Sequence, residues 1–252
     1  MIKEAIILAG GLGTRLQKVV GDLPKPMADI NGKPFLVYLL NFLIEQGIGK
    51  VILSVGYRHE VIKSYFKDRY NTLKIDYSIE TEPLGTGGGI KKAAGLSGSE
   101  TVFVLNGDTF FNISLEKLLQ FHQAIRSDLT IALKPMRQFD RYGCINVNEE
   151  NRITGFFTKG ESVSGGEEKQ YKAPSTQHPA PSTINAGIYL LNKSLFDELS
   201  LPEKFSFETD VLKRHYTDKR FYGVAFDEYF IDIGLPEDYE KARDELRLTT
   251  DQ

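Results

Sequence analysis

Several features that mark whole classes of protein are scarce or absent in this chain of 252 residues. Cys144 is its one cysteine, so no disulfide can form within the chain. The histidines do not have the spacing of metal ligands. No apolar run approaches the length of a membrane-spanning helix, and the first residues lead into a predicted strand rather than a signal peptide. We therefore expect a cytoplasmic protein that does not interact with a membrane.

An excess of charge is also absent, because 31 basic and 34 acidic residues give a formal net charge of -3. Bulk electrostatics therefore gives no reason to expect nucleic acid as a partner. The hydrophobic fraction of 41% and the charged fraction of 26% are typical of a globular protein with a substantial core. Without an internal repeat, this length fits a single domain over residues 1–252.

Predicted strands and helices alternate through the first half of the chain. Short β-branched runs predict strands, and apolar residues at helical spacing predict helices. The expected strands are 5–9, 50–55, 73–79 and 101–105, and the expected helices are 34–46, 59–67, 89–94 and 114–126. This alternation indicates an α/β fold, a Rossmann-like three-layer α/β/α arrangement around a mainly parallel mixed sheet. Ligands of such sheets bind outside the carboxyl ends of the strands.

The second half of the chain is less regular. Strands are expected at 129–133, 143–147, 152–158, 184–191 and across 221–231, and helices at 194–199, 207–215 and 236–246. Residues 160–183 contain almost no large apolar side chains, which predicts a flexible insertion. We expect one half at 1–135, a second half at 136–235 that contains the insertion, and a C-terminal helix within 236–252.

The strongest functional signal directly follows the first strand. Three glycines, Gly10, Gly11 and Gly13, allow a tight turn and leave backbone N–H groups uncovered, so that a phosphate can approach them. Arg15 then supplies a planar fork of donors, and Lys25 lies between two prolines that restrict its backbone. Together these features predict a triphosphate site, although a glycine-rich turn alone is more often a plain strand-to-helix connection. The spacing fits neither a P-loop nor a dinucleotide fingerprint.

Two aspartates are candidates for holding a hard cation. Asp108 follows Asn106 and Gly107 at the end of the fourth strand, a suitable place for a cation ligand or for a simple turn. Asp232 has apolar neighbours and is followed by glycine. Carboxylates are rarely placed among apolar residues without a charge partner. The pair therefore predicts a magnesium site shared by the two halves of the chain.

The run LAGGLGTRL followed by PKPM resembles the signature of the sugar-1-phosphate nucleotidylyltransferases, which join a nucleoside triphosphate to a sugar 1-phosphate and release pyrophosphate. PLGTGGGIK, VLNGDTFF, TIALKP and YFIDIGLPEDY extend the resemblance over nearly the whole chain. It implies a fold of the nucleotide-diphospho-sugar transferase type, catalytic roles for Arg15, Lys25 and Asp108, and catalytic Mg²⁺ on Asp108 and Asp232. The nucleotide contacts that it implies are Leu8, Ala9, Gly10, Gly11, Gly13, Thr14, Arg15, Lys25, Glu80, Gly85, Thr86, Gly87, Asn106 and Asp108.

The same resemblance implies that residues 1–135 are a nucleotide-binding half and residues 136–235 a sugar-phosphate-binding half. The expected sugar-phosphate contacts are Tyr142, Gly143, Lys159, Asn185, Gly187 and Glu208. Amide and carboxylate groups fit sugar hydroxyls because they supply directed donors and acceptors. Lys159 would neutralise the sugar phosphate, but the family often has Glu-Lys where this chain has Thr158-Lys159, and an ordinary surface lysine is the alternative.

Glu80 bears on the choice of base. Uridine- and thymidine-using relatives usually have a glutamine where Glu80 aligns. A carboxylate only accepts hydrogen bonds, and guanine offers two adjacent donors, N1–H and the 2-amino group, whereas uracil offers one donor flanked by carbonyls. Glu80 therefore favours GTP, unless it is a solvated loop charge.

The nature of the sugar follows from the resemblance alone, which is strongest to members that use D-glycero-α-D-manno-heptose 1-phosphate. Mannose 1-phosphate, or uridylyl or thymidylyl transfer to another hexose 1-phosphate, are the alternatives. A nucleotide-sugar-binding regulator without turnover is disfavoured, because it needs neither both magnesium carboxylates nor a transfer lysine. The sequence leaves the oligomeric state open, with a homodimer as one possibility.

Overall fold

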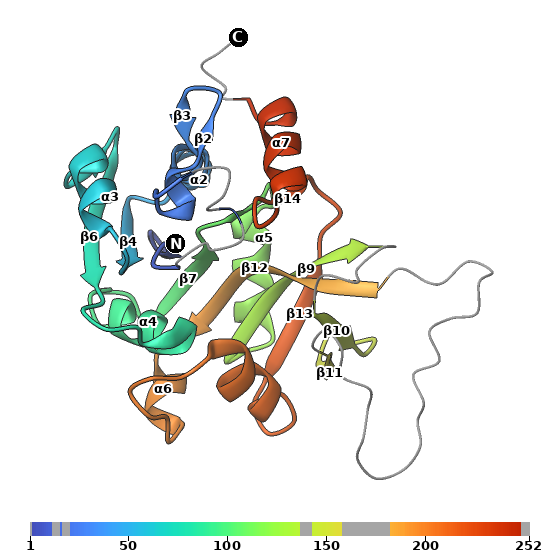
Figure 1. Ribbon diagram of the computed structural model, residues 1–252. Coiled ribbons are helices and arrows are strands. Elements are labelled where there is room, and N and C mark those ends of the chain that lie inside the picture. The colour runs from blue at the N-terminus through green and yellow to red at the C-terminus, as the bar shows by residue number, and fades with distance from the viewer. Residues whose placement is uncertain (1, 12–15, 17–20, 137–142, 158–181, 248–252) are drawn as a thin grey trace.

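The computed structural model describes residues 2–11, 16, 21–136, 143–157 and 182–247, which build one mixed ten-stranded sheet (Figure 1). Four strands form its parallel block, in the spatial order β6 (Leu73–Ile79), β4 (Lys50–Val55), β1 (Glu4–Leu8) and β7 (Thr101–Asn106). The short β5 (Arg69–Tyr70) pairs with β6 at the edge. The mainly parallel first half was predicted from its alternation of strands and helices, and this prediction is confirmed.

The second half continues the sheet beyond β7. The long strand β12 (Ser182–Asn192) runs antiparallel to β7. It also pairs with β10 (Cys144–Val147), which pairs in turn with β11 (Ile153–Phe157). On a separate branch, β9 (Leu129–Met136) pairs with β12 and with β13 (Phe221–Ala225). The insertion predicted at 160–183 lies outside the described residues, except that its last two residues open β12.

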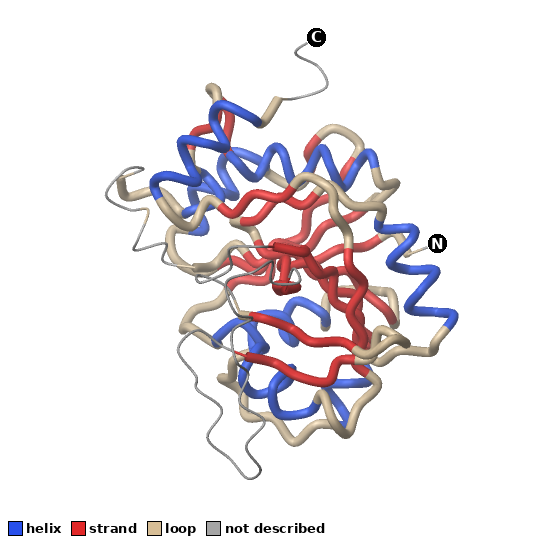
Figure 2. Tube along the Cα trace, turned by 90° about the vertical axis from the view of Figure 1, so that its right-hand side faces the viewer, coloured by secondary structure: helices blue, strands red, loops and turns tan. Residues whose placement is uncertain are grey.

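Helices cover both faces of the sheet, as Figure 2 shows above and below the band of strands. Side chains alternate along β1, so Ala5 and Ile7 join one buried apolar cluster and Ile6 joins the other. The first cluster contains apolar side chains of α2 (Phe35–Glu45), α3 (His59–Phe66), α5 (Leu115–Ala124) and α7 (Pro236–Glu245). The second contains those of α4 (Gly85–Ala94), α6 (Ser194–Glu198) and the π-helical segment η2 (Phe207–Lys213). The predicted three-layer arrangement is therefore confirmed.

Helix α4 corrects one predicted boundary. The sequence predicts a helix from Gly89, whereas α4 begins at Gly85 and takes the preceding glycines into its first turns. Glycine disfavours helix because of its backbone entropy. Here the N–H groups of Gly87 and Gly88 donate to the carbonyl of Phe205, so a contact distant in sequence holds the turn.

Two small sheets lie apart from the main one. The hairpin of β2 (Asp29–Ile30) and β3 (Lys33–Pro34) follows a short 3₁₀ helix, η1 (Lys25–Met27). The other pairs β8 (Thr109–Phe111) with β14 (Phe230–Asp232), so the strands expected across 221–231 are β13 and β14. No described helix is both long and apolar enough to cross a membrane.

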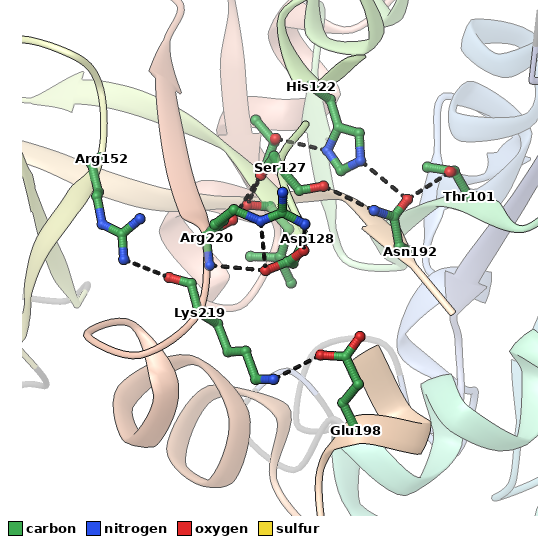
Figure 3. Close-up of polar contacts among 11 residues, drawn as sticks. Thr101, His122, Ser127, Asp128, Arg152, Asn192, Glu198, Lys219 and Arg220 are labelled. Atoms are coloured by element: carbon green, nitrogen blue, oxygen red, sulfur yellow. Dashed lines mark hydrogen bonds and ion pairs between the residues drawn. The ribbon is translucent and has the colours of Figure 1, made fainter. Parts of the chain in front are cut away.

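A polar cluster is buried where β7 begins (Figure 3). The Asn192 amide donates to the Ser127 carbonyl, so its Oδ1 accepts from Thr101 Oγ1 at 2.6 Å and from His122 Nε2 at 3.3 Å. His122 Nδ1 then accepts from Thr130 Oγ1 at 2.9 Å, which fixes the neutral Nε2–H tautomer. Burial lowers the pKa of His122 below its usual value.

Candidate active site

A cavity of about 210 Å³ opens at the carboxyl ends of β1 and β7, where the sequence predicts a ligand. These two parallel strands are neighbours, so the residues that follow them meet at one edge of the sheet. The predicted site residues that line this cavity are Leu8, Ala9, Gly11, Lys25, Thr86, Asn106, Asp108 and Glu208. Gly13, Thr14, Arg15, Tyr142 and Lys159 lie outside the described residues, and their roles stay predictions.

Lys25 lies between the two predicted metal ligands. Its Nζ is 2.5 Å from Asp108 Oδ2 and 3.8 Å from Asp232 Oδ1, and only 11% of its side chain is exposed. The residue begins η1 immediately after Pro24, and Pro26 is the next residue of that turn. The restriction of its backbone by two prolines, expected from the sequence, is therefore observed.

The pairing of β8 with β14 brings the two aspartates together. Asp232 is the register partner of Thr109, and the N–H of Ile233 donates to the Asp108 carbonyl at 2.9 Å. The N–H of Gly234 donates to Asp232 Oδ1 at 2.7 Å. Burial, and next the charge of Asp108, raise the pKa of Asp232 to about 6, while Lys25 acts in the opposite direction.

The glycine before Asp108 is required by the neighbouring strand. A Cβ on Gly107 would overlap the carbonyl oxygen of Leu8, which accepts a hydrogen bond from the Gly107 N–H. The residue that follows β7 therefore lies directly against the end of β1. This contact places Asp108 beside the start of the glycine-rich turn.

The described part of the cavity has a donor set that fits a divalent cation. Asp108 and Glu208 line it, and Lys25 is the one described cation on its wall. Asp232 is not on the wall, but its Oδ1 lies 3.8 Å from the Nζ of Lys25. No three described His, Cys, Asp or Glu side chains converge as a metal-ligand group. Two carboxylates would therefore be the protein's share of a magnesium site, with water and phosphate oxygens completing it, as is usual for Mg²⁺ with phosphate substrates.

Among the residues predicted to contact the sugar, the Asn185 side chain forms hydrogen bonds within the protein. Its Nδ2 donates to the Tyr189 hydroxyl at 2.8 Å, and its Oδ1 accepts from the Gly187 N–H at 3.1 Å. Gly187 has φ +74°, and a Cβ there would lie 2.6 Å from Asn106 Nδ2. Asn185 and Gly187 therefore shape the site, whereas the ring of Tyr189 lines the cavity.

Glu208 lies in the first turn of η2 and faces the cavity. Burial is the main cause that raises the pKa of Glu208, and the charge of Asp108 adds to it. The preceding N–H, that of Phe207, donates to Thr86 Oγ1 at 2.9 Å. This bond joins the first turn of η2 to the first turn of α4.

The glycines of PLGTGGG prove to have a packing role that the sequence did not indicate. A Cβ on Gly85 would lie 2.5 Å from the Phe205 carbonyl oxygen, and one on Gly87 would overlap the Phe205 ring. A Cβ on Gly88 would lie 2.5 Å from the Glu203 carbonyl oxygen. Their small size therefore lets α4 pack on the segment before η2, while their contact with a nucleotide stays a prediction.

Glu80 follows β6 and lies beside the glycine-rich turn, not on the wall of the cavity itself. Its Oε1 accepts from Ser54 Oγ at 3.1 Å, and its Oε2 accepts from the Leu84 N–H at 3.0 Å. A Cβ on Gly10 would lie 3.5 Å from Glu80 Oε1. Glu80 is therefore anchored at both oxygens, not a freely solvated loop charge.

Tyr189 and Ser54 are two residues of the site that the sequence prediction did not include. Tyr189 lies in the apolar run of β12, where an aromatic residue is typical of core, and only its spacing of four from Asn185 gives a signal. Ser54 lies in the buried run KVILSV, where a serine between apolar residues indicates a hydrogen-bond partner within the protein. Tyr189 accepts a hydrogen bond from Asn185, and Ser54 donates one to Glu80 at the end of the neighbouring strand.

Comparison with known proteins shows what the whole chain is similar to. A family model described as "Nucleotidyl transferase" matches residues 4–248. The chain is 49% identical to a D-glycero-alpha-D-manno-heptose 1-phosphate guanylyltransferase of Aneurinibacillus thermoaerophilus over 97% of this chain and 98% of that protein. It is also 49% identical to the protein of that name from Campylobacter jejuni subsp. jejuni serotype O:2, over 94% of this chain and 96% of the relative.

Among solved structures, HddC from Yersinia pseudotuberculosis complexed with GMP-PN matches with a TM-score of 0.79 and 37% identity, covering 98% of this chain and all of that one. A putative glucose-1-phosphate thymidylyltransferase from Bacillus anthracis shares the fold at a TM-score of 0.79 and 16% identity, covering 98% of this chain and 97% of that one. The predicted type of fold is confirmed.

Proposed function

The chain belongs to the nucleotidyl transferase family, and on that basis we propose that it transfers GMP from GTP to D-glycero-α-D-manno-heptose 1-phosphate. The products are the GDP-heptose and pyrophosphate. The observation that supports nucleotidyl transfer is the convergence of Lys25, Asp108 and Asp232 beside the turn after β1. The guanosine and the heptose are supported by the two relatives of 49% identity, whose names specify both.

No general base is needed for this reaction. The phosphate oxygen of the sugar is already anionic near neutral pH, and it attacks the α-phosphorus in line as pyrophosphate departs. The difficulty lies in bringing two polyanions together and stabilising the charge on the leaving group. Magnesium, when bound at Asp108 and Asp232, would supply a divalent charge to the phosphates.

Different residues of the chain would bind the triphosphate and the sugar phosphate. The Gly10–Gly11 backbone and Lys25 hold the triphosphate, with Arg15 and Thr14 as further proposed contacts. Lys25 is an ammonium already directed into the cavity by η1, so it can move from the aspartates to phosphate oxygens over a short path. Lys159 is the proposed partner of the sugar phosphate.

The sugar would bind between Tyr189 and Glu208. Their hydroxyl and carboxylate supply directed hydrogen-bonding groups for sugar hydroxyls. We place the reaction in the cytoplasm, where nucleoside triphosphates are available, and propose Mg²⁺ as the metal.

The test is release of pyrophosphate in the presence of magnesium. GTP, ATP, CTP, UTP and dTTP are each combined with heptose, mannose, glucose and N-acetylglucosamine 1-phosphates. Turnover confined to GTP with the heptose is expected. Equal turnover with mannose 1-phosphate would overturn the heptose assignment, and turnover with UTP or dTTP would overturn the assignment of the base.

A matched pair of variants connects the activity to the site. Asp232→Asn removes one proposed metal ligand and is expected to reduce kcat by about a hundredfold or more. Asp244→Asn makes the same chemical change on the exposed side of α7 and is expected to leave turnover unchanged. Normal turnover by Asp232→Asn would exclude its assigned role.

A further inference from the structure

The Glu80 carboxylate is held by two donors from different elements. Ser54 Oγ, on β4, donates to Oε1 at 3.1 Å, and the N–H of Leu84, before α4, donates to Oε2 at 3.0 Å. A carboxylate oxygen can accept two hydrogen bonds. Each oxygen of Glu80 therefore keeps one acceptor site beyond these contacts.

Ser54 is itself fixed in place. It is 1% exposed, and its carbonyl accepts from the Ala9 N–H at 2.7 Å where β4 lies beside β1. A buried strand residue of this kind has little freedom to move. The hydroxyl of Ser54 therefore gives Oε1 a rigid point of attachment.

The space around the carboxylate depends on a glycine. A Cβ on Gly89 would lie 2.7 Å from Glu80 Oε1 and 3.0 Å from Ser54 Oγ. The absence of a side chain at this place in α4 makes room for the bond between Glu80 and Ser54. Gly89 therefore serves the carboxylate and not the packing on Phe205 that accounts for Gly85 and Gly87.

We propose that Ser54 is the positioning residue that sets the base specificity of this enzyme. By holding Oε1 while Leu84 holds Oε2, it presents the free acceptor sites of Glu80 side by side to the N1–H and 2-amino donors of guanine. A glutamate without this attachment turns about its side-chain bonds and offers no fixed pair of acceptors. This inference rests on the proposed function and on the sequence prediction that Glu80 accepts from guanine.

The structure also supplies a matched control. Ser78 is the register partner of Ser54 in the parallel pair of β4 and β6, and it is 2% exposed. Its Oγ is the one buried side-chain polar atom without a partner among the described residues. Ser78→Ala therefore removes the same group beside the same strands without touching Glu80.

The experiment compares GTP with inosine triphosphate, which lacks the 2-amino group. The readout is the ratio of kcat/KM for the two nucleotides in the wild type, Ser54→Ala and Ser78→Ala, at saturating sugar 1-phosphate. We expect Ser54→Ala to reduce the preference for GTP about tenfold, the effect of weakening one hydrogen bond to a charged group. The change should lie in the KM for GTP, with kcat and the KM for the sugar unchanged, and Ser78→Ala should keep the wild-type ratio.

Gly89→Ala provides a second way to displace the carboxylate, because its Cβ would lie 2.7 Å from Oε1 and 3.0 Å from Ser54 Oγ and so crowd the bond between them. It is expected to reduce the preference as Ser54→Ala does, and it serves if that variant does not fold. A wild-type ratio in both variants would overturn the proposal. So would a loss of preference in Ser78→Ala equal to that in Ser54→Ala, since the effect would then be general.

Glu80→Gln distinguishes a failure of the positioning role of Ser54 from a failure of guanine recognition by Glu80. If Glu80→Gln abolishes the preference and Ser54→Ala does not, only the positioning role fails. If the wild type does not discriminate GTP from inosine triphosphate, or Glu80→Gln leaves the ratio unchanged, the reading of guanine by Glu80 fails, and the positioning role fails with it.

Discussion

Replacing Lys25 by methionine tests whether its ammonium balances the two aspartates in the protein without metal. The lysine lies 2.5 Å from Asp108 and 3.8 Å from Asp232. Methionine keeps most of the apolar stem and removes the charge. The two carboxylates then face each other without a described cation between them.

The cost follows from the exposure of these groups. Removing one partner of a fully buried ion pair destabilises a protein by about 3–5 kcal/mol. The side chain of Asp108 is 34% exposed and that of Asp232 is 26% exposed, so water screens part of the loss. We expect the free energy of unfolding of Lys25→Met to be lower by about 2 kcal/mol in the absence of divalent metal.

Magnesium should then restore the stability that the positive charge of Lys25 supplied. A cation that binds only the folded protein stabilises it, and it meets less competition when the ammonium is gone. Urea unfolding with EDTA and with excess magnesium measures both effects. The expected result is a larger gain in stability from magnesium in Lys25→Met than in the wild type or in Lys117→Met, a variant of an exposed lysine on α5.

Two results would contradict the roles assigned to Lys25 and to the two aspartates. If Lys25→Met is as stable as the wild type without metal, the ammonium does not balance the aspartates. If magnesium stabilises all three proteins equally, the two aspartates are not where it binds. The activity of Lys25→Met should fall by about a hundredfold or more, because a cation acting on the triphosphate is lost.

Three further changes probe the fold. Gly187→Ala forces a side chain into positive φ and against Asn106, so we expect a loss of about 1–2 kcal/mol in urea unfolding, and a loss below ~0.5 kcal/mol would contradict the strain. Burial keeps the pKa of His122 below that of the unfolded chain, so the unfolded state binds more protons, and stability should fall as the pH decreases below about 6.5. His122→Gln should flatten that dependence, and an unchanged slope would exclude His122 as its cause. Ser78→Ala removes a buried hydroxyl without a described partner, so thermal unfolding should show equal or higher stability, and a clear loss would reveal a hidden partner.

The sequence predicts those parts of the molecule that depend on local patterns. The strands β4 and β6 have the predicted bounds, because a short β-branched run flanked by polar residues is a local signal. The convergence of Asp108 and Asp232 was also predicted, although from their apolar surroundings and not from the strand pairing that produces it. A carboxylate among apolar residues implies a partner wherever the chain provides one.

Contacts between distant segments account for what the sequence did not show. The start of α4 depends on Phe205, and the pairing of β14 with β8 depends on a return of the chain more than a hundred residues later. Ser54 acts on Glu80 because β4 and β6 are neighbours, which no property of a lone serine indicates. Helical propensity and periodicity describe one segment at a time, so these effects are outside their reach.

The packing of α4 on the segment before η2 has a consequence for protein engineering. The motif PLGTGGG looks like a self-contained module that could be exchanged between enzymes of different base specificity. Gly85 and Gly87, however, fit the backbone and ring of Phe205. Gly88 fits the Glu203 carbonyl, and Thr86 accepts from Phe207. A chimera should therefore carry residues 203–207 together with the motif, and a graft of the motif alone would separate two surfaces that are shaped for each other.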